Sequence, residues 1–251
     1  MNDLHTEGPP PTSTDLFGMD DALPDTLPSD PFAVFKEWFD LAHKHEITPN
    51  PNAFTLATVD PDGTPSARVV LCRKIDTKDG HITFFTNRTS DKGKAIAAHP
   101  AVAAVFHWDA FDKVVRIKGH AVESPDWESD EYFDGRHPAK RLAAWSSDQS
   151  KPIDSRDRLT EMVAEIMQRF ELSIEDIEDT PEARERGSTL IPRPPHWGGY
   201  RIWAHTVELW VGNKARLHDR ARYTRELAPM TGPDGEEAFT ASDWSATRLM
   251  P

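Results

Sequence analysis

The chain has 251 residues and a formal net charge of −13, with 37% hydrophobic and 28% charged residues, which fits a globular protein with one substantial core. The acidic balance argues against nucleic-acid binding, and no apolar run reaches the roughly 20 residues of a membrane helix. A single cysteine, Cys72, excludes an internal disulfide framework and a cysteine-rich metal site, and we expect no bound metal. The N-terminus has no basic or apolar leader segment, so we expect a cytoplasmic protein.

The first predicted elements are an arm and a helix. Residues 1–28 are rich in Pro, Asp, Thr and Gly, and we expect them to form a flexible N-terminal arm ahead of one domain over 29–251. Asp30 makes a good N-cap with Pro31 at the first helical position, and apolar residues follow at helical spacing. This pattern predicts an amphipathic helix over 31–45.

A series of short strands follows. β-Branched and aromatic stretches alternate with turns that contain Asp and Gly, which is typical of an antiparallel meander. Ser90 is placed to cap a short helix over 91–100. Ser124 and Pro125 begin another helix, which weakens at His137 because that residue precedes a proline. The expected strands cover 53–60, 67–75, 81–87, 101–108 and 113–123.

The last third of the chain predicts a helix and a hairpin. Apolar spacing indicates a long amphipathic helix over 155–171, and the acidic stretch 171–187 is expected to be a surface insertion. Strands over 200–211 and 214–223 predict a β-hairpin, since Gly212-Asn213 suits a two-residue turn. Six or more antiparallel strands with flanking helices predict an α+β, barrel-like domain.

Positive charge gathers in the second half of this hairpin, where Lys214, Arg216, His218, Arg220 and Arg222 lie within nine residues. A strand would place the last four of these on one face. Such a face is either a solvated edge strand that resists aggregation or a binding surface for phosphate or carboxylate, because it cannot be buried without a counter-anion.

Three further cations support an anion site. Lys92 lies in the first turn of the short helix, where backbone N–H groups attract phosphate, although a surface lysine fits this position equally well. Arg68 and Arg73 bracket an apolar strand on opposite faces, so both can serve one ligand only with a twist or a bulge. Cys72 lies inside an apolar strand, which is typical of a buried small hydrophobic residue rather than a nucleophile.

Five stretches, in this order, resemble the FMN-dependent pyridoxine (pyridoxamine) 5′-phosphate oxidase family: LATVDPDGTPSARVVLCRKID, FFTNRTSDKGKAI, YFDGRHPAKRLAAWSSDQS, WGGYRIWAHTVELWVGNKARLHDR and the terminal RLMP. The resemblance runs from about Pro28 to Pro251, with 171–187 as an extra segment. It implies an antiparallel split β-barrel, the FMN-binding split barrel, with flanking helices. It also implies a homodimer with FMN at the subunit interface, which oxidises the 4′ carbon of the vitamin phosphate with oxygen to give pyridoxal 5′-phosphate.

The resemblance also implies individual site residues. The implied FMN contacts are Arg68, Val69, Val70, Leu71, Cys72, Arg73, Phe85, Thr86, Lys92, Gln149, Ser150, Trp210 and Arg220. The implied substrate contacts are Arg73, Tyr132, Arg136, Lys140, Arg216, Leu217 and His218, with Arg216 or His218 as the catalytic group that polarises the substrate. The positive strand would thereby hold two anionic molecules.

Helical spacing gives an independent reason to group some of these residues. Tyr132 and Arg136 are four apart in a helical stretch, so their side chains leave one face and can converge on one group. Lys140 follows four residues later but beyond Pro138. If Lys140 turns back to the same site, the clamp suits a phosphate; otherwise Lys140 faces solvent after the helix break.

The sequence departs from the family pattern at several positions. Arg73 stands where a lysine is usual, Asp91 where a basic FMN contact is common, Val114 where a glutamine contact is found, and Lys140 where a serine helps to hold the substrate phosphate. The N-terminal arm also lacks the basic-plus-tyrosine segment of some members. Three functions therefore stay open: a vitamin phosphate oxidase, an oxidase of another planar anionic aromatic such as a dihydrophenazine, and a non-catalytic FMN- or pyridoxal-phosphate-binding protein.

Overall fold

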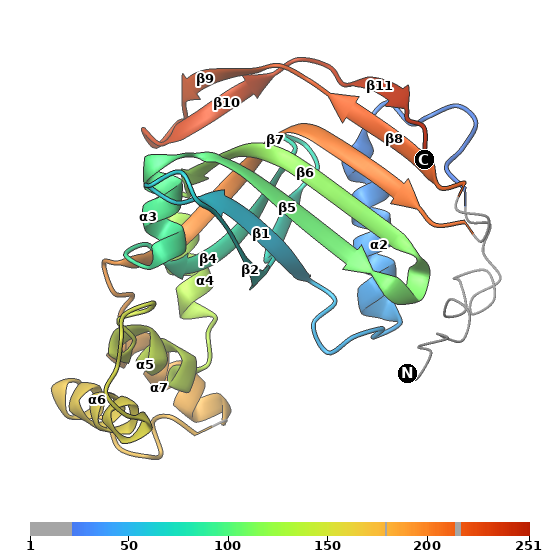
Figure 1. The fold of residues 1–251 in the computed structure, drawn as a ribbon. Coiled ribbons are helices and arrows are strands. Elements are labelled where there is room, and N and C mark those ends of the chain that lie inside the picture. The colour runs from blue at the N-terminus through green and yellow to red at the C-terminus, as the bar shows by residue number, and fades with distance from the viewer. Residues whose placement is uncertain (1–21, 179, 214–216) are drawn as a thin grey trace, which may run out of the picture.

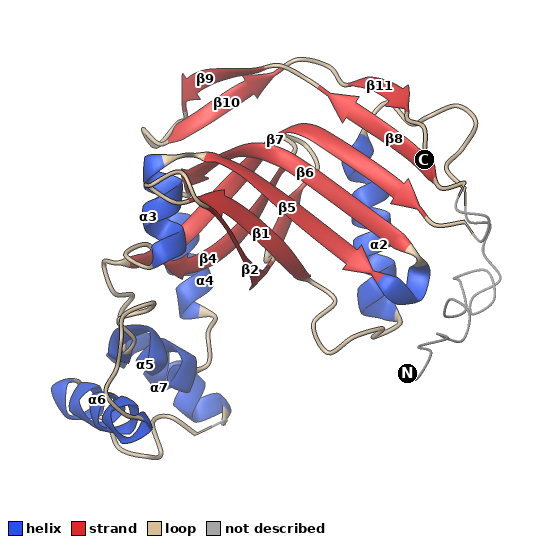
Figure 2. Cartoon of the chain, in the orientation of Figure 1, coloured by secondary structure: helices blue, strands red, loops and turns tan. Residues whose placement is uncertain are grey.

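The structure is a computed structural model that describes residues 22–178, 180–213 and 217–251. A strongly curved antiparallel sheet forms the centre of the molecule (Figure 1). Nine strands make up this sheet in the order β11-β8-β7-β6-β5-β1-β2, with β4 pairing β7 and β3, and β9 and β10 form a separate two-stranded sheet (Figure 2). The strands are β1 (Ala53–Val59), β2 (Pro65–Leu71), β3 (Lys74–Asp76), β4 (His81–Asn87), β5 (Ala101–Trp108), β6 (Lys113–Glu123), β7 (Trp197–Val211), β8 (Asp219–Thr224), β9 (Leu227–Thr231), β10 (Glu237–Ala241) and β11 (Ser245–Arg248). The expected α+β class with an antiparallel barrel sheet is confirmed.

Helices cover the ends and the outside of the sheet. They are α2 (Pro31–Lys44), α3 (Asp91–Ala98), α4 (Asp126–Asp134), α5 (Pro138–Ser146), α6 (Arg156–Arg169) and α7 (Pro181–Leu190), with a 3₁₀ turn η1 at Asp109–Phe111. Helices α5, α6 and α7 form a lobe beside the sheet (Figure 1). Among the described residues, no helix is long and apolar enough to cross a membrane.

Helix α2 closes one end of the barrel. Asp30 caps it by accepting a hydrogen bond from the N–H of Phe32 at 2.9 Å, as the sequence predicts. Phe32 and Phe35 are fully buried, and the ring of Phe35 lies 4.8 Å from that of Phe106 on β5. Packing begins even earlier, because Leu23 is only 4% exposed, so part of the expected arm belongs to the core. The rest of that arm, residues 1–21, lies outside the described residues.

The expected strand over 67–75 is wrong in one respect, because the structure divides it into β2 and β3. Residues up to Leu71 pair with β1, whereas β3 pairs with β4. At the break, the N–H of Cys72 donates to the Asn52 carbonyl at 2.9 Å and that of Arg73 donates to the Thr83 carbonyl at 2.8 Å. The chain thus changes partner strands at Cys72, and this corner supplies the irregularity that Arg68 and Arg73 need to line one cleft.

The expected two-residue turn at Gly212-Asn213 is also wrong. Strand β7 ends at Val211 and β8 begins only at Asp219, so a longer loop joins them, of which 214–216 lies outside the described residues. Register pairs Trp210 with Arg220. His218 therefore precedes the strand, and of the four cations expected on one strand face, only Arg220 and Arg222 lie within β8.

The helical lobe differs from expectation in three ways. Helix α5 follows directly after His137, whose Nδ1 accepts a hydrogen bond from the Ala139 N–H at 3.1 Å, so Pro138 begins a helix instead of ending one. Helix α6 confirms the predicted amphipathic helix, yet none of its residues is buried. The acidic stretch contains part of α7, and Ala183 of that helix is fully buried.

Candidate functional site

A cleft of about 1720 Å³ opens beside β2 and extends to α4 and α5. We call it the β2–α4 cleft. Strand β4, the start of α3 and the segment 147–150 complete its walls. The predicted contacts that line it are Arg68, Val69, Val70, Leu71, Arg73, Phe85, Thr86, Lys92, Tyr132, Arg136, Lys140, Gln149 and Ser150. The structure thus brings most of the predicted FMN contacts and the α4–α5 substrate contacts into one space.

Arg68 is held firmly at one end of the cleft. Its guanidinium donates to the Thr58 hydroxyl and to the Ser66 hydroxyl, each at 2.6 Å. Both hydroxyls come from the β1–β2 pair, where Thr58 and Ser66 are register partners. The neighbouring Val69 side chain is 67% exposed and offers an apolar surface in the cleft. A cation beside an exposed apolar strand suits a ligand that has both an anionic and a flat apolar part.

Lys92 and Gln149 join the start of α3 to β4. The Lys92 ammonium donates to the Gln149 side-chain oxygen at 2.7 Å, and the Thr86 hydroxyl donates to the same oxygen at 3.1 Å. Ser90 caps α3 as predicted. Burial, and then the nearby Arg68, lower the pKa of Lys92. A lysine and a helix N-terminus together favour a bound phosphate.

An aromatic stack supports the other end of the cleft. The rings of Phe85 and Tyr132 lie parallel with centroids 4.1 Å apart, and Trp197 lies parallel to Phe85 at 5.5 Å. The Arg73 guanidinium is 5.6 Å from the centroid of the Tyr132 ring. This stack fixes the orientation of Tyr132 from the side of β4, because parallel aromatic faces resist rotation of the ring.

Arg136 is desolvated but keeps a free hydrogen-bonding group. Its guanidinium lies 4.7 Å from the Trp197 ring centroid and 5.4 Å from that of Phe133. Its Nη1 is buried and has no hydrogen-bond partner among the described residues. Burial lowers the pKa of Arg136, and the nearby Arg73 adds repulsion. A preorganised cation with an unused donor fits an anionic ligand group.

The remaining predicted contacts lie away from the cleft. Trp210 and Arg220 are register partners on β7 and β8, and Val114 pairs with Trp210 from β6. The His218 ring lies 4.5 Å from that of Trp210, and Leu217 is largely exposed. Arg216, the other predicted catalytic residue, lies outside the described residues. One chain alone therefore does not bring the two predicted groups together.

Glu208 is the counter-anion of the positive strand, and no motif or spacing in the sequence singled it out. Its carboxylate is 5% exposed and accepts hydrogen bonds from Arg220 at 2.7 Å, Arg222 at 3.1 Å and Arg116 at 3.3 Å. We call these four residues the Glu208 cluster. Burial by itself raises the pKa of Glu208, but the hydrogen bonds from Arg220 and Arg222 outweigh it and hold that pKa below its ordinary value.

Cys72 is the one member of the predicted 68–73 stretch that does not line the cleft. It is 1% exposed, and its thiol donates to the Lys74 carbonyl at 3.3 Å. Burial raises the pKa of the thiol to about 12, so it stays protonated and unreactive. The expectation of a buried small hydrophobic residue is confirmed.

Other cleft residues were missed by the sequence reasoning. They include Lys74, Trp127, Glu128, Glu131 and Trp197. Glu128 lies four residues before Tyr132, so the spacing that grouped Tyr132 with Arg136 could also have found it. Trp197 is the first residue of the WGG stretch, which was used only as a family signature.

A curved antiparallel barrel with a cation-lined cleft beside an exposed apolar strand defines the class of flavin-nucleotide-binding split barrels.

Comparisons with known proteins agree with this class. The chain matches the family description "Pyridoxamine 5′-phosphate oxidase" over residues 42–170 and "Pyridoxine 5′-phosphate oxidase C-terminal dimerisation region" over 197–251. The pyridoxine/pyridoxamine 5′-phosphate oxidase of Burkholderia lata is 41% identical over 222 residues, which cover 88% of this chain and 89% of that protein. The Nostoc punctiforme protein of the same name is 44% identical over 195 residues, which cover 78% of this chain and 82% of that protein.

Two solved structures are similar in fold. PhzG from Burkholderia lata, in complex with tetrahydrophenazine-1-carboxylic acid, has a TM-score of 0.70 at 27% identity and covers 92% of this chain and 100% of its own. A pyridoxamine 5′-phosphate oxidase-related, FMN-binding protein from Nostoc punctiforme has a TM-score of 0.59 at 16% identity. The match covers 88% of this chain and 98% of that protein. The chain belongs to the pyridoxamine 5′-phosphate oxidase family and is an FMN-dependent oxidoreductase with the split-barrel fold.

Proposed function

We propose that this protein oxidises pyridoxine 5′-phosphate or pyridoxamine 5′-phosphate to pyridoxal 5′-phosphate, with oxygen as the electron acceptor. The observation that carries the proposal is the convergence of Arg73, Tyr132, Arg136 and Lys140 on the cleft that also contains Arg68 and Lys92. Two anionic groups can be held there, one at each end of the cleft. The names of the relatives, which share about two fifths of their residues with this chain, support the same reaction.

The cleft fits FMN by its chemistry. Lys92 and the first N–H groups of α3 suit the terminal phosphate, and Arg68 adds a second cation near them. Val69 and its neighbours Val70 and Leu71 offer an apolar wall for a flat ring. When bound, FMN supplies the acceptor for two electrons, while the protein supplies binding, orientation and electrostatics.

We propose that a second copy of the chain completes the site. The match to the family's C-terminal dimerisation region covers Trp210, His218 and Arg220, which lie outside the cleft of their own chain. In a homodimer with two-fold symmetry, the same surface can supply these residues to the cleft of the other copy. Arg220 then serves FMN, and Arg216 and His218 serve the substrate.

Each residue has a defined task in the proposed reaction. Arg136, Tyr132 and Lys140 hold the substrate phosphate, and Arg73 adds charge at the same end. Glu208 holds the Arg220 guanidinium in one orientation. His218 or Arg216 polarises the hydroxyl or amino group on the 4′ carbon. A hydride leaves the 4′ carbon, a proton leaves that group, and oxygen takes up both electrons and both hydrogens as hydrogen peroxide. The alcohol substrate gives the aldehyde and hydrogen peroxide, whereas the amine also consumes one water and releases ammonia.

The second candidate is oxidation of another planar anionic aromatic. The solved neighbour with a bound tetrahydrophenazine-1-carboxylic acid favours it, as does Lys140 in place of the usual serine. To separate the candidates, the FMN-loaded protein is supplied under air with pyridoxine 5′-phosphate, pyridoxamine 5′-phosphate or a dihydrophenazine carboxylic acid. Hydrogen peroxide formed with the first two supports the proposal. Peroxide formed only with the third overturns it, and no peroxide with any of them supports a binding protein without turnover.

A further inference from the structure

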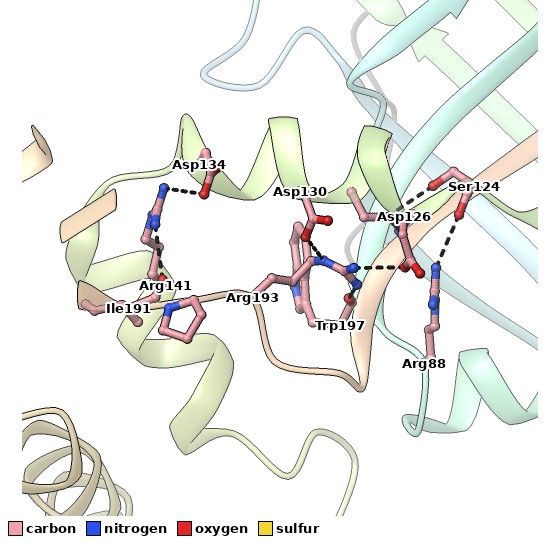
Figure 3. Close-up of polar contacts among 12 residues, drawn as sticks. Arg88, Ser124, Asp126, Asp130, Asp134, Arg141, Ile191, Arg193 and Trp197 are labelled. Carbon is pink, nitrogen blue, oxygen red and sulfur yellow. Dashed lines mark hydrogen bonds and ion pairs between the residues drawn. The ribbon is translucent and has the colours of Figure 1, made fainter. Parts of the chain in front are cut away.

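We propose that Arg193 is a positioning residue that fixes both walls of the Arg136 pocket. The proposal rests on the proposed function, because it is that function which gives Tyr132 and Arg136 their role in substrate binding. Arg193 itself does not line the cleft. It lies in the short segment between α7 and β7, beside α4 (Figure 3).

The Arg193 guanidinium divides its donors among three acceptors. Nε donates to Asp130 Oδ1 at 2.6 Å, Nη2 donates to Asp126 Oδ1 at 2.8 Å, and Nη1 donates to the Trp197 carbonyl at 2.8 Å (Figure 3). The Arg193 side chain is 12% exposed. Arginine suits this arrangement because its five N–H donors form a rigid planar fork, whereas the three donors of lysine radiate from a single nitrogen.

The two aspartates connect this fork to α4. Asp126 and Asp130 are four residues apart and therefore lie on one face of the helix, whereas Glu128, Glu131 and Tyr132 line the cleft. Helix α4 is only nine residues long and its N-cap makes no side-chain hydrogen bond, so it has little stability of its own. A clamp across one full turn fixes the direction in which the cleft-facing side chains leave the helix.

The third acceptor belongs to the opposite wall of the pocket. The carbonyl of Trp197 is held by Arg193, and the indole of the same residue lies against the Arg136 guanidinium and is stacked on Phe85. Phe133, the other ring against Arg136, is on α4. One guanidinium therefore sets the spacing between the two aromatic surfaces that flank Arg136.

The segment that carries Arg193 is itself anchored. Arg141 on α5 is fully buried and donates to the Ile191 carbonyl at 3.1 Å (Figure 3). The indole N–H of Trp145, also on α5, donates to the Pro192 carbonyl at 2.7 Å. The two residues before Arg193 are thus tied to the helix that presents Lys140, so Arg193 acts from a fixed base.

Exposure indicates that this clamp contributes geometry more than stability. The side chains of Asp126 and Asp130 are 76% and 53% exposed, so water can solvate both carboxylates when the largely buried guanidinium is removed. Loss of the clamp is therefore expected to leave the protein folded while it loosens the Arg136 pocket. That combination separates a positioning role from a purely structural one.

The test uses FMN-loaded Arg193→Gln and Arg193→Lys with pyridoxamine 5′-phosphate as substrate. We expect KM to rise by roughly 10-fold while kcat and the Kd for FMN stay within about 2-fold, because a loosened phosphate pocket weakens ground and transition states alike. Asp130→Asn should reproduce part of the rise, and in the double variant the effects should not add. The matched control is Arg158→Gln, which removes an arginine that contacts two carboxylates on α6, Glu161 and Glu165.

Unchanged KM in Arg193→Gln, or equal losses in KM, kcat and FMN affinity, overturns the positioning role. A wild-type protein that oxidises neither vitamin phosphate overturns the proposed function instead. In that case, hydrogen exchange of 126–136 in the FMN-loaded protein decides the Arg193 proposal. Faster exchange there in Arg193→Gln but not in Arg158→Gln supports it, and equal exchange in wild type and both variants overturns it.

Discussion

At the residue scale, the Glu208 cluster explains how an acidic chain keeps several arginines side by side. Glu208 neutralises one charge and orients Arg220, while Arg116 and Arg222 leave an excess of positive charge on the same face. The alternative of a solvated edge strand is wrong, because β8 lies between β7 and β11 in the sheet. The Glu208 carboxylate partly neutralises the three arginines, and in the proposed dimer Arg220 is one of the cations that bind FMN.

Arg220→Ala should weaken FMN binding by about 1.5–3 kcal/mol, the usual contribution of a charge-assisted hydrogen bond. Titration of the apoprotein with FMN, followed by flavin fluorescence, measures the change. The control is Arg222→Ala, which removes a guanidinium from the same carboxylate without touching a predicted FMN contact. Equal FMN affinity in wild type and Arg220→Ala would exclude Arg220 from the flavin site.

Arg136→Ala should raise KM for a phosphorylated substrate roughly 10- to 150-fold and change kcat far less, because the lost contact grips substrate and transition state alike. Steady-state peroxide formation measures both constants. Lys140→Ser, which restores the residue usual in the family, should keep or improve turnover of pyridoxine 5′-phosphate. Equal use of dephosphorylated pyridoxine, or an unchanged KM in Arg136→Ala, would contradict the phosphate clamp and favour the other aromatic substrate.

Titration of His81 should account for part of the pH dependence of the free energy of unfolding. Burial lowers its pKa from 6.5 to about 4, although Asp76, whose carboxylate is 3.8 Å away, opposes the shift. Between these values the unfolded chain binds a proton that the folded chain does not, so the free energy of unfolding falls as the pH drops from 6.5 towards 4. The slope from this group is at most about 1.4 kcal/mol per pH unit.

His81→Gln should remove this contribution and flatten the pH profile over that range. Urea unfolding at several pH values measures the free energy of unfolding for both proteins. The control is His107→Gln, which replaces an exposed histidine. Parallel profiles for wild type and His81→Gln would show that another group carries the acid sensitivity.

At the element scale, α2 is the part of the core that closes the barrel. Phe35→Ala should lower the free energy of unfolding by about 3–5 kcal/mol, because it opens a cavity among fully buried aromatic rings. Denaturant unfolding with the transition followed by tryptophan fluorescence measures the loss. Lys36→Ala, on the exposed side of the same helix, should change stability by no more than about 0.5 kcal/mol. If Phe35→Ala lowers the free energy of unfolding no more than about 0.5 kcal/mol, as expected for Lys36→Ala, then α2 is not packed in the barrel.

Other elements show what periodicity can and cannot predict. The spacing of Leu159, Met162 and Ile166 indicated an amphipathic helix, and α6 is one, but spacing did not reveal that this face stays partly exposed within one chain. Strands β9, β10 and β11 were not predicted at all, because their residues are mostly exposed and carry little alternation.

At the scale of the whole molecule, the proposed site combines two separate groups of predicted contacts from two copies of the chain. We expect light scattering of the FMN-bound protein to give twice the mass of one chain, because Trp210, His218 and Arg220 do not line the cleft of their own chain and are proposed to serve that of a second copy. A monomeric mass for a protein that carries FMN and turns over substrate would contradict the shared site. The Arg136→Ala protein is a useful control, since its change at the substrate pocket should leave the dimer intact.

Local chemistry in the sequence determined much of this protein. Turn residues, β-branched stretches and the caps at Asp30 and Ser90 predicted most strands and two helices, because these preferences act within a few residues. The same local information gave the cations of the cleft and the resemblance to the oxidase family.

Only the tertiary structure decided which of these residues meet. The corner at Cys72 lets Arg68 and Arg73 line one cleft, Glu208 pairs with Arg220 and Arg222 across a strand pair, and α5 places Lys140 in the wall of the β2–α4 cleft. The contacts at the corner and across the strand pair join residues that lie on different strands, and their formation depends on strand register and barrel closure. The direction of α5 depends on packing against the segment after α7. Local residue preferences do not encode those long-range pairings. The sequence therefore indicated which residues belong to the cleft, and the tertiary structure determined which of them contact one another.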